Sequence, residues 1–290
     1  MPLIVPGYKY YIFISYQGRI TSAKDTKNIL SMLMKSNSII MFTVVLILVG
    51  FTNTSTFKGK EATNKKRDLG SKVGLEISFE GIDGNSFKEE DKQRIANIIV
   101  ESEEKVRTLL PKLSKEIKVT VTLIDRNIDV VGGVTGRADA PGVVLIKISK
   151  VFPGGIYAAV RTALSSTIFH EFHHLVRGWT TEGIKYGVGI LIAAVNEGLA
   201  TVFSEQYTGV EFDAIAYPEN VDDWVEEIQT LPKNAIYYHW MNEHPDGRVY
   251  IGYRVGRYII HKAIINSGKD ILELSKLSPD DILKLAELRN

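Results

Sequence analysis

The side chains best suited to chemistry lie in the run His170-Glu171-Phe172-His173-His174. Residues four apart on a helix share one face, so His170 and His174 can direct both imidazoles at one metal ion. Zinc binds imidazole nitrogen readily, and a catalytic zinc keeps one coordination position open for water. Glu171 would lean toward that water and could accept its proton as a general base. The run therefore predicts most of a hydrolytic site.

The sequence around this run predicts a helix over residues 156–177. Its apolar residues recur at helical spacing and form one stripe: Val160, Leu164, Ile168, Phe172 and Leu175. The two histidines lie beside this stripe, on a face that we expect to be buried. Histidines satisfied within a core are the alternative interpretation. A buried group of two histidines and a glutamate is costly unless it is paired or bound to metal, which favours a metal site.

A third ligand is available in the run Asn196-Glu197-Gly198-Leu199-Ala200. A turn at 178–187 and a second, strongly apolar helix at 188–207 would bring Glu197 back toward the histidines. The small residues on either side of Leu199 leave room for a metal beside the carboxylate. Glu197 could instead pair with the histidines without metal, and Glu182, Glu205 and His173 are rival ligands. We expect Glu197 to complete the site.

These residues resemble the gluzincin metallopeptidases, and more closely a family of predicted zinc-dependent proteases. The resemblance extends from about Lys118 to the C-terminus. It rests on four runs: Val131-Gly132-Gly133-Val134-Thr135-Gly136, His170-Glu171-Phe172-His173-His174-Leu175-Val176-Arg177, Glu197-Gly198-Leu199-Ala200 and Gly252-Tyr253-Arg254-Val255-Gly256. Found together, the histidine and glutamate runs are specific for these families. The two glycine runs are weak individually and support the resemblance only because they occur in the expected order along the chain.

The resemblance implies that His170, His174 and Glu197 bind Zn²⁺ and that Glu171 is the base. Many gluzincins place an aspartate four residues after the glutamate ligand, where it orients a histidine. This chain has Thr201 there. A ligand histidine normally needs such a partner to fix its tautomer. The candidates for that role are Glu205, Asn196 and a backbone carbonyl.

Composition excludes several classes of protein. The 290 residues carry a net charge of +1, and no stripe of basic residues alternates with aromatic ones, so nucleic-acid binding is not expected. The absence of cysteine excludes disulfides, thiolate ligands and a cysteine nucleophile. The sequence indicates no oligomeric state.

The N-terminal part differs from the remainder. Residues 39–51 are an uncharged apolar run with the length of a signal-peptide core. We therefore expect 38–55 to be a signal peptide or an uncleaved membrane anchor. The extension at 1–37 before it could be explained by a translation start assigned too far upstream. A polar linker would follow at 56–72. The protein is then exported or membrane-anchored, with its catalytic domain outside the cytoplasm.

The catalytic domain is expected at 73–290. Alternating or apolar runs predict strands at 75–79, 118–124 and 143–149, with a long helix at 89–113. Because strands precede a helical C-terminal half, the fold class is α+β. The resemblance implies a zincin-like metalloprotease fold, with a small N-terminal sheet before the two helices that hold the ligands.

Other residues are candidates for substrate binding. By analogy with gluzincins, the segment 144–148, which begins at Val144, or the segment 132–136 around Gly133 would pair with an extended peptide. These glycines could equally just shape a turn. Stabilising the oxyanion formed during hydrolysis requires a donor. Tyr253 is the first candidate and His244 the second.

The most consistent function is a zinc-dependent protease that cleaves peptide or protein substrates with Glu171 as general base. Two alternatives remain open. One is a zinc hydrolase acting on a non-peptide amide, and the other is a membrane-attached zinc-binding domain without catalysis. A purely structural site has no use for Glu171 and prefers closed coordination by protein ligands.

Overall fold

The computed structural model describes residues 74–81, 84, 86–232 and 234–289, and these belong to one compact unit. The predicted extension at 1–37, the apolar segment at 38–55 and the linker at 56–72 lie outside the described residues. Among the helices that the structure does describe, none is long and apolar enough to cross a membrane.

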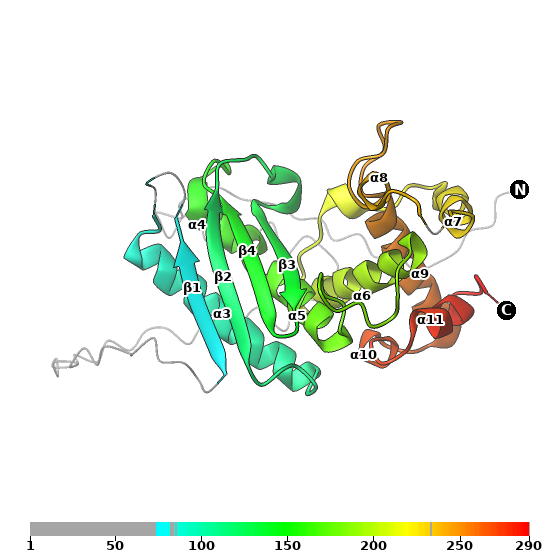
Figure 1. Cartoon of the computed structure of the whole chain (residues 1–290), viewed down its shortest axis with the longest axis horizontal. Coiled ribbons are helices and arrows are strands. Elements are labelled where there is room, and N and C mark those ends of the chain that lie inside the picture. The colour runs from blue at the N-terminus through cyan, green and yellow to red at the C-terminus, as the bar shows by residue number, and fades with distance from the viewer. Residues whose placement is uncertain (1–73, 82–83, 85, 233, 290) are drawn as a thin grey trace, which may run out of the picture. The chain divides into compact units, whose positions relative to one another are not determined.

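A mixed sheet forms one half of the described unit (Figure 1). Its strands follow the order β1-β2-β4-β3, and β1, β2 and β4 run parallel while β3 is antiparallel to β4. The bounds are Leu75–Glu80 for β1, Ile117–Ile124 for β2, Val134–Ala140 for β3 and Val143–Ser149 for β4. The sheet thus ends at β3, on the side nearest the helical half (Figure 1).

Alternation of side chains decides which face of the sheet is covered. In β2 the apolar residues Val119 and Val121 are buried, and Thr120 and Thr122 between them are half-buried. The long helix α3 (Glu89–Leu109) and the helix α5 (Ser165–Arg177) both contact the sheet, at β1 and β3 respectively. Successive strand residues point to opposite faces, so one face forms core and the other stays open.

No strand was predicted at 134–140, although the segment 132–136 was one candidate for pairing with a peptide. The residues of β3, Val-Thr-Gly-Arg-Ala-Asp-Ala, include few of the β-branched and aromatic types that favour strands. Pairing with the strongly apolar β4 holds it in the sheet. The strands expected at 75–79, 118–124 and 143–149 are present, and the helix expected at 89–113 ends earlier, at Leu109.

The helix expected at 156–177 is continuous but not uniform. It consists of α4 (Gly155–Ala159), a π-helical segment η2 (Val160–Leu164) and α5. The π segment directly precedes α5, which carries the histidines, and such segments are frequent at functional sites. Helix α5 ends at Gly178, which adopts a left-handed conformation with φ of 63°, as helix-terminating glycines commonly do.

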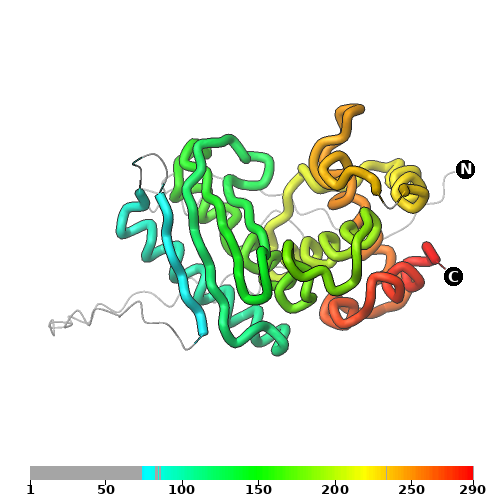
Figure 2. Tube along the Cα trace, in the orientation of Figure 1, coloured from blue at the N-terminus to red at the C-terminus, as the bar shows by residue number. Residues whose placement is uncertain are grey.

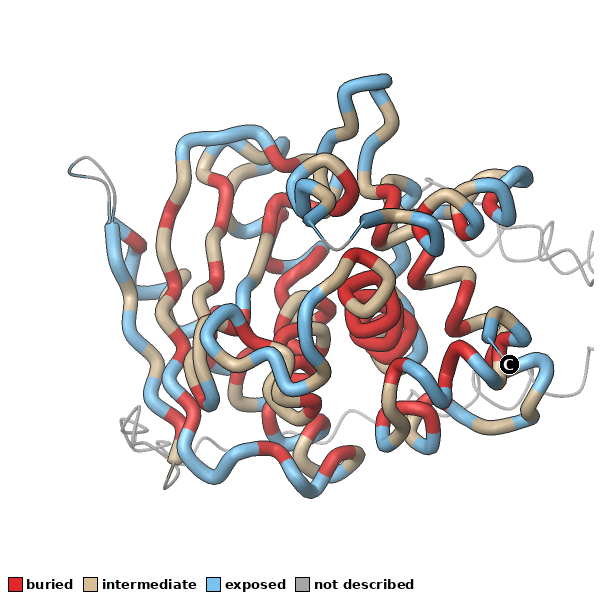
Figure 3. The backbone as a smooth tube through the Cα atoms, turned by 45° about the vertical axis from the view of Figure 1, so that its right-hand side comes forward, coloured by how far each residue is buried: buried red, intermediate tan, exposed pale blue. Residues whose placement is uncertain are grey.

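Helix α6 (Ile190–Thr208) runs through the middle of the helical half and is buried along most of its length (Figure 3). The C-terminal helices and the loops between them surround α6 (Figure 2). Their bounds are α7 (Val221–Gln229), α8 (Tyr237–Met241), α9 (Ile251–Ser267), α10 (Ile271–Leu274) and α11 (Pro279–Leu285). The four strands of the sheet lie in the N-terminal half of the described chain and a series of helices follows them, which confirms the predicted α+β class.

Helices α6 and α9 approach each other through glycine. A Cβ on Gly198 would lie 2.3 Å from the carbonyl oxygen of Gly256, and a Cβ on Gly256 would lie 1.9 Å from the carbonyl oxygen of Ala194. Only glycine permits such a close backbone crossing. The contact fixes α6, and with it the position of Glu197.

Candidate active site

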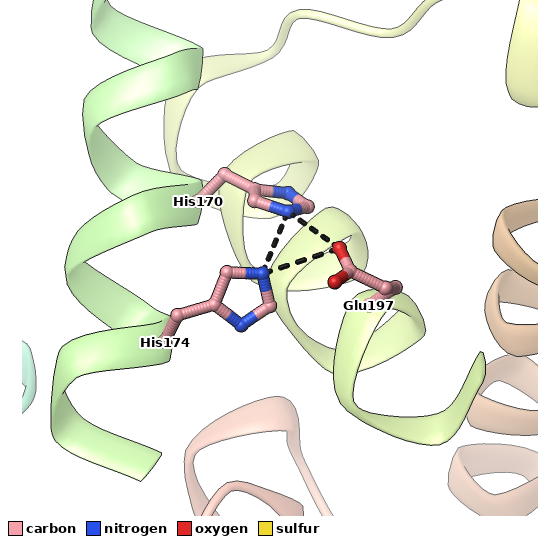
Figure 4. Close-up of side chains that lie close together, drawn as sticks. All are labelled: His170, His174 and Glu197. Atoms are coloured by element: carbon pink, nitrogen blue, oxygen red, sulfur yellow. Dashed lines mark hydrogen bonds and ion pairs between the residues drawn. The ribbon is translucent and has the colours of Figure 1, made fainter. Parts of the chain in front are cut away.

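Three side chains from α5 and α6 converge on one point (Figure 4). The Nε2 atoms of His170 and His174 are 3.0 Å apart. The Oε2 atom of Glu197 is 3.0 Å from the first and 3.2 Å from the second. In the described part of the chain, this is the group of histidine and acidic side chains placed to hold a metal ion.

The geometry of this group fits a zinc ion. Two nitrogen ligands at tetrahedral positions around zinc are roughly 3.3 Å apart, close to the separations here. Two imidazoles and one carboxylate are also the protein ligands found at many hydrolytic zinc centres. His170 is half-buried while His174 and Glu197 are buried, so one side of the group remains open for water.

The carboxylate of Glu197 is oriented by a tryptophan. The indole Nε1 of Trp179 donates to Oε1 of Glu197 at 3.3 Å, which leaves Oε2 facing the histidines. Burial acts to raise the pKa of Glu197, but the charge and hydrogen bonds of His174 and His170 outweigh it and hold that pKa well below its usual value. Glu197 is therefore an anion, as a metal ligand must be.

The three candidates for orienting a histidine do not do so. Glu205 pairs with Arg257, at 2.9 Å. Asn196 accepts a hydrogen bond from Arg177 at 3.1 Å. Nδ1 of His174 is buried and has no hydrogen-bond partner within the described residues, a backbone carbonyl included. Within the group, the side chain that a hydrogen bond from outside orients is thus Glu197, through Trp179.

The rival ligands lie elsewhere. Nε2 of His173 is 2.8 Å from the hydroxyl oxygen of Ser275, and burial lowers the pKa of His173 well below its usual value, so its ring is neutral. Glu205 is held by Arg257, and Glu182 is an exposed loop residue. The structure groups none of these three with the histidine pair.

Glu171 lies beneath strand β3. A Cβ on Gly136 would be 2.6 Å from Oε1 of Glu171, so the carboxylate occupies the space that a side chain would need. The backbone N–H of Ala138 donates to the same carboxylate. Burial raises the pKa of Glu171 to about 7, which suits a group that must accept and release a proton near neutrality.

Two tyrosines, Tyr253 and Tyr237, lie close enough to Glu197 for its charge to act on them, although the side chain of Tyr237 is half-exposed. Burial raises the pKa of Tyr253 well above its usual value, and the negative charge of Glu197 adds to this effect. Burial and Glu197 also raise the pKa of Tyr237. Both hydroxyls therefore stay protonated and can donate. Tyr237 was not singled out from the sequence, because only the tertiary fold brings α8 beside the metal group.

Three predicted substrate residues are not placed at the site. Val144 is buried in β4, which pairs with β2 on one side and β3 on the other, so no peptide can add there. That prediction was wrong. Gly133 has a φ of 82°, and a Cβ there would lie 2.6 Å from Phe152, so it shapes a packed turn. His244 pairs with Asp246 at 2.9 Å and stacks near Trp240.

A cleft of about 670 Å³ adjoins the site, within the usual size of ligand-binding pockets. His170, Glu171 and Tyr253 line it together with Gly136 and Thr201. Glu171 and Tyr253 thus border the same cleft.

Residues 95–284 match the model of a family described as predicted Zn-dependent protease. The chain belongs to this family. The match spans most of the described part, including the histidines, Glu171, Glu197 and Tyr253, and it agrees with the resemblance seen in the sequence. Comparison with curated proteins finds no significant match, and neither does comparison with solved structures.

Proposed function

We propose that the protein is a zinc-dependent peptidase with His170, His174 and Glu197 as metal ligands and Glu171 as general base. The observation that supports this most is the pairing of a three-ligand group with a buried carboxylate at the edge of one cleft. A purely structural zinc site would be closed by a further protein ligand and would have no use for Glu171.

Zinc, when bound, would lower the pKa of a water molecule and polarise the substrate carbonyl. Glu171 would accept the proton of the attacking water and transfer it to the nitrogen of the departing amine as the C–N bond breaks. Its pKa of about 7 allows both transfers. The hydroxyl of Tyr253 would donate to the oxyanion that develops on the carbonyl oxygen, and Tyr237 is a second donor for the same charge.

Strand β3 offers a backbone edge for the substrate. In an antiparallel pair, residues alternate between those bonded to the partner strand and those facing away. The carbonyl oxygen of Gly133, just before β3, accepts from the backbone N–H of Ser149 in β4 at 2.9 Å, so the backbone groups of Val134, Gly136 and Ala138 face outward. Ala138 is already engaged by Glu171 and Thr181. Gly136, directly above the base, would therefore pair with an extended peptide.

The decisive experiment compares Glu171→Gln with wild type on a mixed peptide library, with products read by mass spectrometry. We expect the variant to retain zinc one-to-one but to lose nearly all cleavage. Glu90→Gln, on the exposed surface of α3, is the matched control and should cleave normally. A Glu171→Gln protein that cleaves as well as wild type would rule out Glu171 as the base.

The ligands are tested separately by metal content. His174→Ala should lose zinc, whereas His244→Ala should keep it because His244 lies with Asp246 outside the group. Retention of stoichiometric zinc by His174→Ala would contradict its role as a ligand.

Attachment to a membrane or export through residues 38–55 remains part of the proposal. It rests on the apolar run at 39–51 and places the peptidase outside the cytoplasm. Fractionation of cells that express the full chain tests it. Recovery of all the protein in the cytosolic fraction would contradict it.

A further inference from the structure

The free edge of β3 is closed at one end by the loop between α5 and α6. The backbone N–H of Thr181 donates to the carbonyl oxygen of Ala138 at 3.0 Å, and that of Glu182 donates to Asp139 at 2.9 Å. The loop therefore occupies the position that a substrate strand would need beyond Ala138. A peptide paired with Gly136 cannot continue along β3 in that direction.

The closing loop is held in place by its own contacts. Trp179 and Ile184 form an antiparallel bridge. The backbone N–H of Thr180 donates to the carbonyl oxygen of Gly183 at 2.9 Å, and the N–H of Gly183 donates back to the hydroxyl of Thr180 at 2.8 Å. Trp179 also donates to the ligand Glu197. Moving the loop aside would therefore break bonds within the loop and disturb the metal group.

The cleft extends only away from this loop. Its lining includes Val134, Gly136 and Arg137 of β3 but no residue from 138–140 and none from 178–189. From there it continues past Glu171 and His170 toward apolar residues beyond the site, such as Val131, Phe212 and Ile215. Along β3, the cleft is thus lined by residues from Val134 to Arg137 and stops short of Ala138, where the loop pairs with the strand.

The direction of the peptide decides which end of a substrate meets the closure. Antiparallel strand pairs outnumber parallel ones, and an antiparallel peptide on β3 would run from the Ala138 side toward Val134. Its N-terminal end would then face the loop, and the residues after the scissile bond would fill the cleft. We propose that the enzyme removes residues from the free N-terminus of peptides. This inference rests on the proposed peptidase function.

The charges at the closed end agree with a free amine. Asp139 adjoins Ala138, and its negative charge acts on Glu171, although it is paired with Arg137. Glu182, across the backbone bond to Asp139, is exposed and has no ion-pair partner within the described residues. Both carboxylates place negative charge where the ammonium group of a substrate would lie.

The test uses the zinc-loaded full chain and one peptide prepared in three forms: free at both ends, N-acetylated, and C-terminally amidated. We expect shortening from the N-terminus, a loss of roughly tenfold or more in rate on acetylation, and little effect of amidation. Glu171→Gln should be inactive on all three and serves as the control for a contaminating peptidase.

Three other results would overturn the inference. Internal cleavage regardless of acetylation would show that both sides of the site are open, while leaving the peptidase function intact. Shortening from the C-terminus that amidation prevents would show that the peptide runs the other way. No zinc-dependent cleavage of any form, nor of the mixed library, would overturn the peptidase function and this inference together.

Discussion

Gly136 of β3 lies directly over the carboxylate of Glu171, so closely that a Cβ would stand 2.6 Å from Oε1 and 2.4 Å from Cγ. An alanine there must push the base away from the cleft. We expect Gly136→Ala to bind zinc normally and to lose roughly 100-fold in kcat/KM, the scale of a small displacement of a catalytic group. Steady-state kinetics with metal analysis checks this. Unchanged kinetics would mean that Glu171 can move without consequence.

Trp179 should control zinc affinity. Replacing it with phenylalanine removes the indole N–H that donates to Glu197 but keeps an aromatic ring in the loop. Loss of a bond that orients a ligand typically costs about 10-fold or more in metal affinity. Competition with a chelator measures the Kd. Trp224→Phe, on α7 away from the metal group, is the control, and equal Kd values for both variants would exclude the orienting role.

Tyr253 and Tyr237 should differ in their effect on turnover. Tyr253 lines the cleft, so Tyr253→Phe should lower kcat by about 100-fold with little change in KM. Tyr237→Phe should lower it less. Tyr258 is on the same helix as Tyr253, and its hydroxyl donates to Asp222 at 2.7 Å. Tyr258→Phe is therefore the control and should keep its kcat. A Tyr253→Phe enzyme with normal kcat would remove Tyr253 as the oxyanion donor.

The crossing of α6 and α9 predicts an asymmetry between two glycines of α9. At Gly256 an added Cβ meets the backbone oxygen of Ala194 at 1.9 Å, whereas at Gly252 it meets the flexible side chain of Met241. We expect Gly256→Ala to cost about 2 kcal/mol or more in the free energy of unfolding, and Gly252→Ala to cost less. Denaturant unfolding checks both. Equal losses would show that α6 and α9 can separate freely.

Glu171 should make the stability of the metal-free protein depend on pH. Its pKa is raised by burial from 4.5 to about 7, so the folded state binds this proton more tightly than the unfolded state. Its contribution is therefore fully present below about 4.5 and is lost as pH rises toward about 7, by up to about 3 kcal/mol. Glu171→Gln should lack this loss. Parallel pH profiles of unfolding for the two proteins would contradict the shifted pKa.

Several features could be predicted because they depend on local geometry. The spacing of His170 and His174 on one helix face follows from the helical repeat, and the apolar run around Glu197 indicated a buried helix.

The partners from distant parts of the chain could not be predicted. Strand β3 has weak strand propensity and forms because β4 pairs with it, so the sequence left the edge of the sheet open between 144–148, which is wrong, and 132–136, which overlaps β3. Trp179 donates to Glu197, and Tyr237 lies within reach of its charge, only because the whole core fixes the positions of the loop and of α8. Because Thr201 stands where many gluzincins have an aspartate, the sequence did not show which residue orients the metal-binding side chains. In the structure the oriented side chain is Glu197, through Trp179, and not a histidine.

By itself the sequence predicted the type of chemistry, since helical spacing alone places two imidazoles and the carboxylate of Glu171 on adjoining positions. Only the tertiary structure decided how a substrate can approach that chemistry. Register between strands and contact between loops depend on packing across the whole domain. Those long-range contacts set Gly136 over Glu171 and closed the edge of β3 at Ala138.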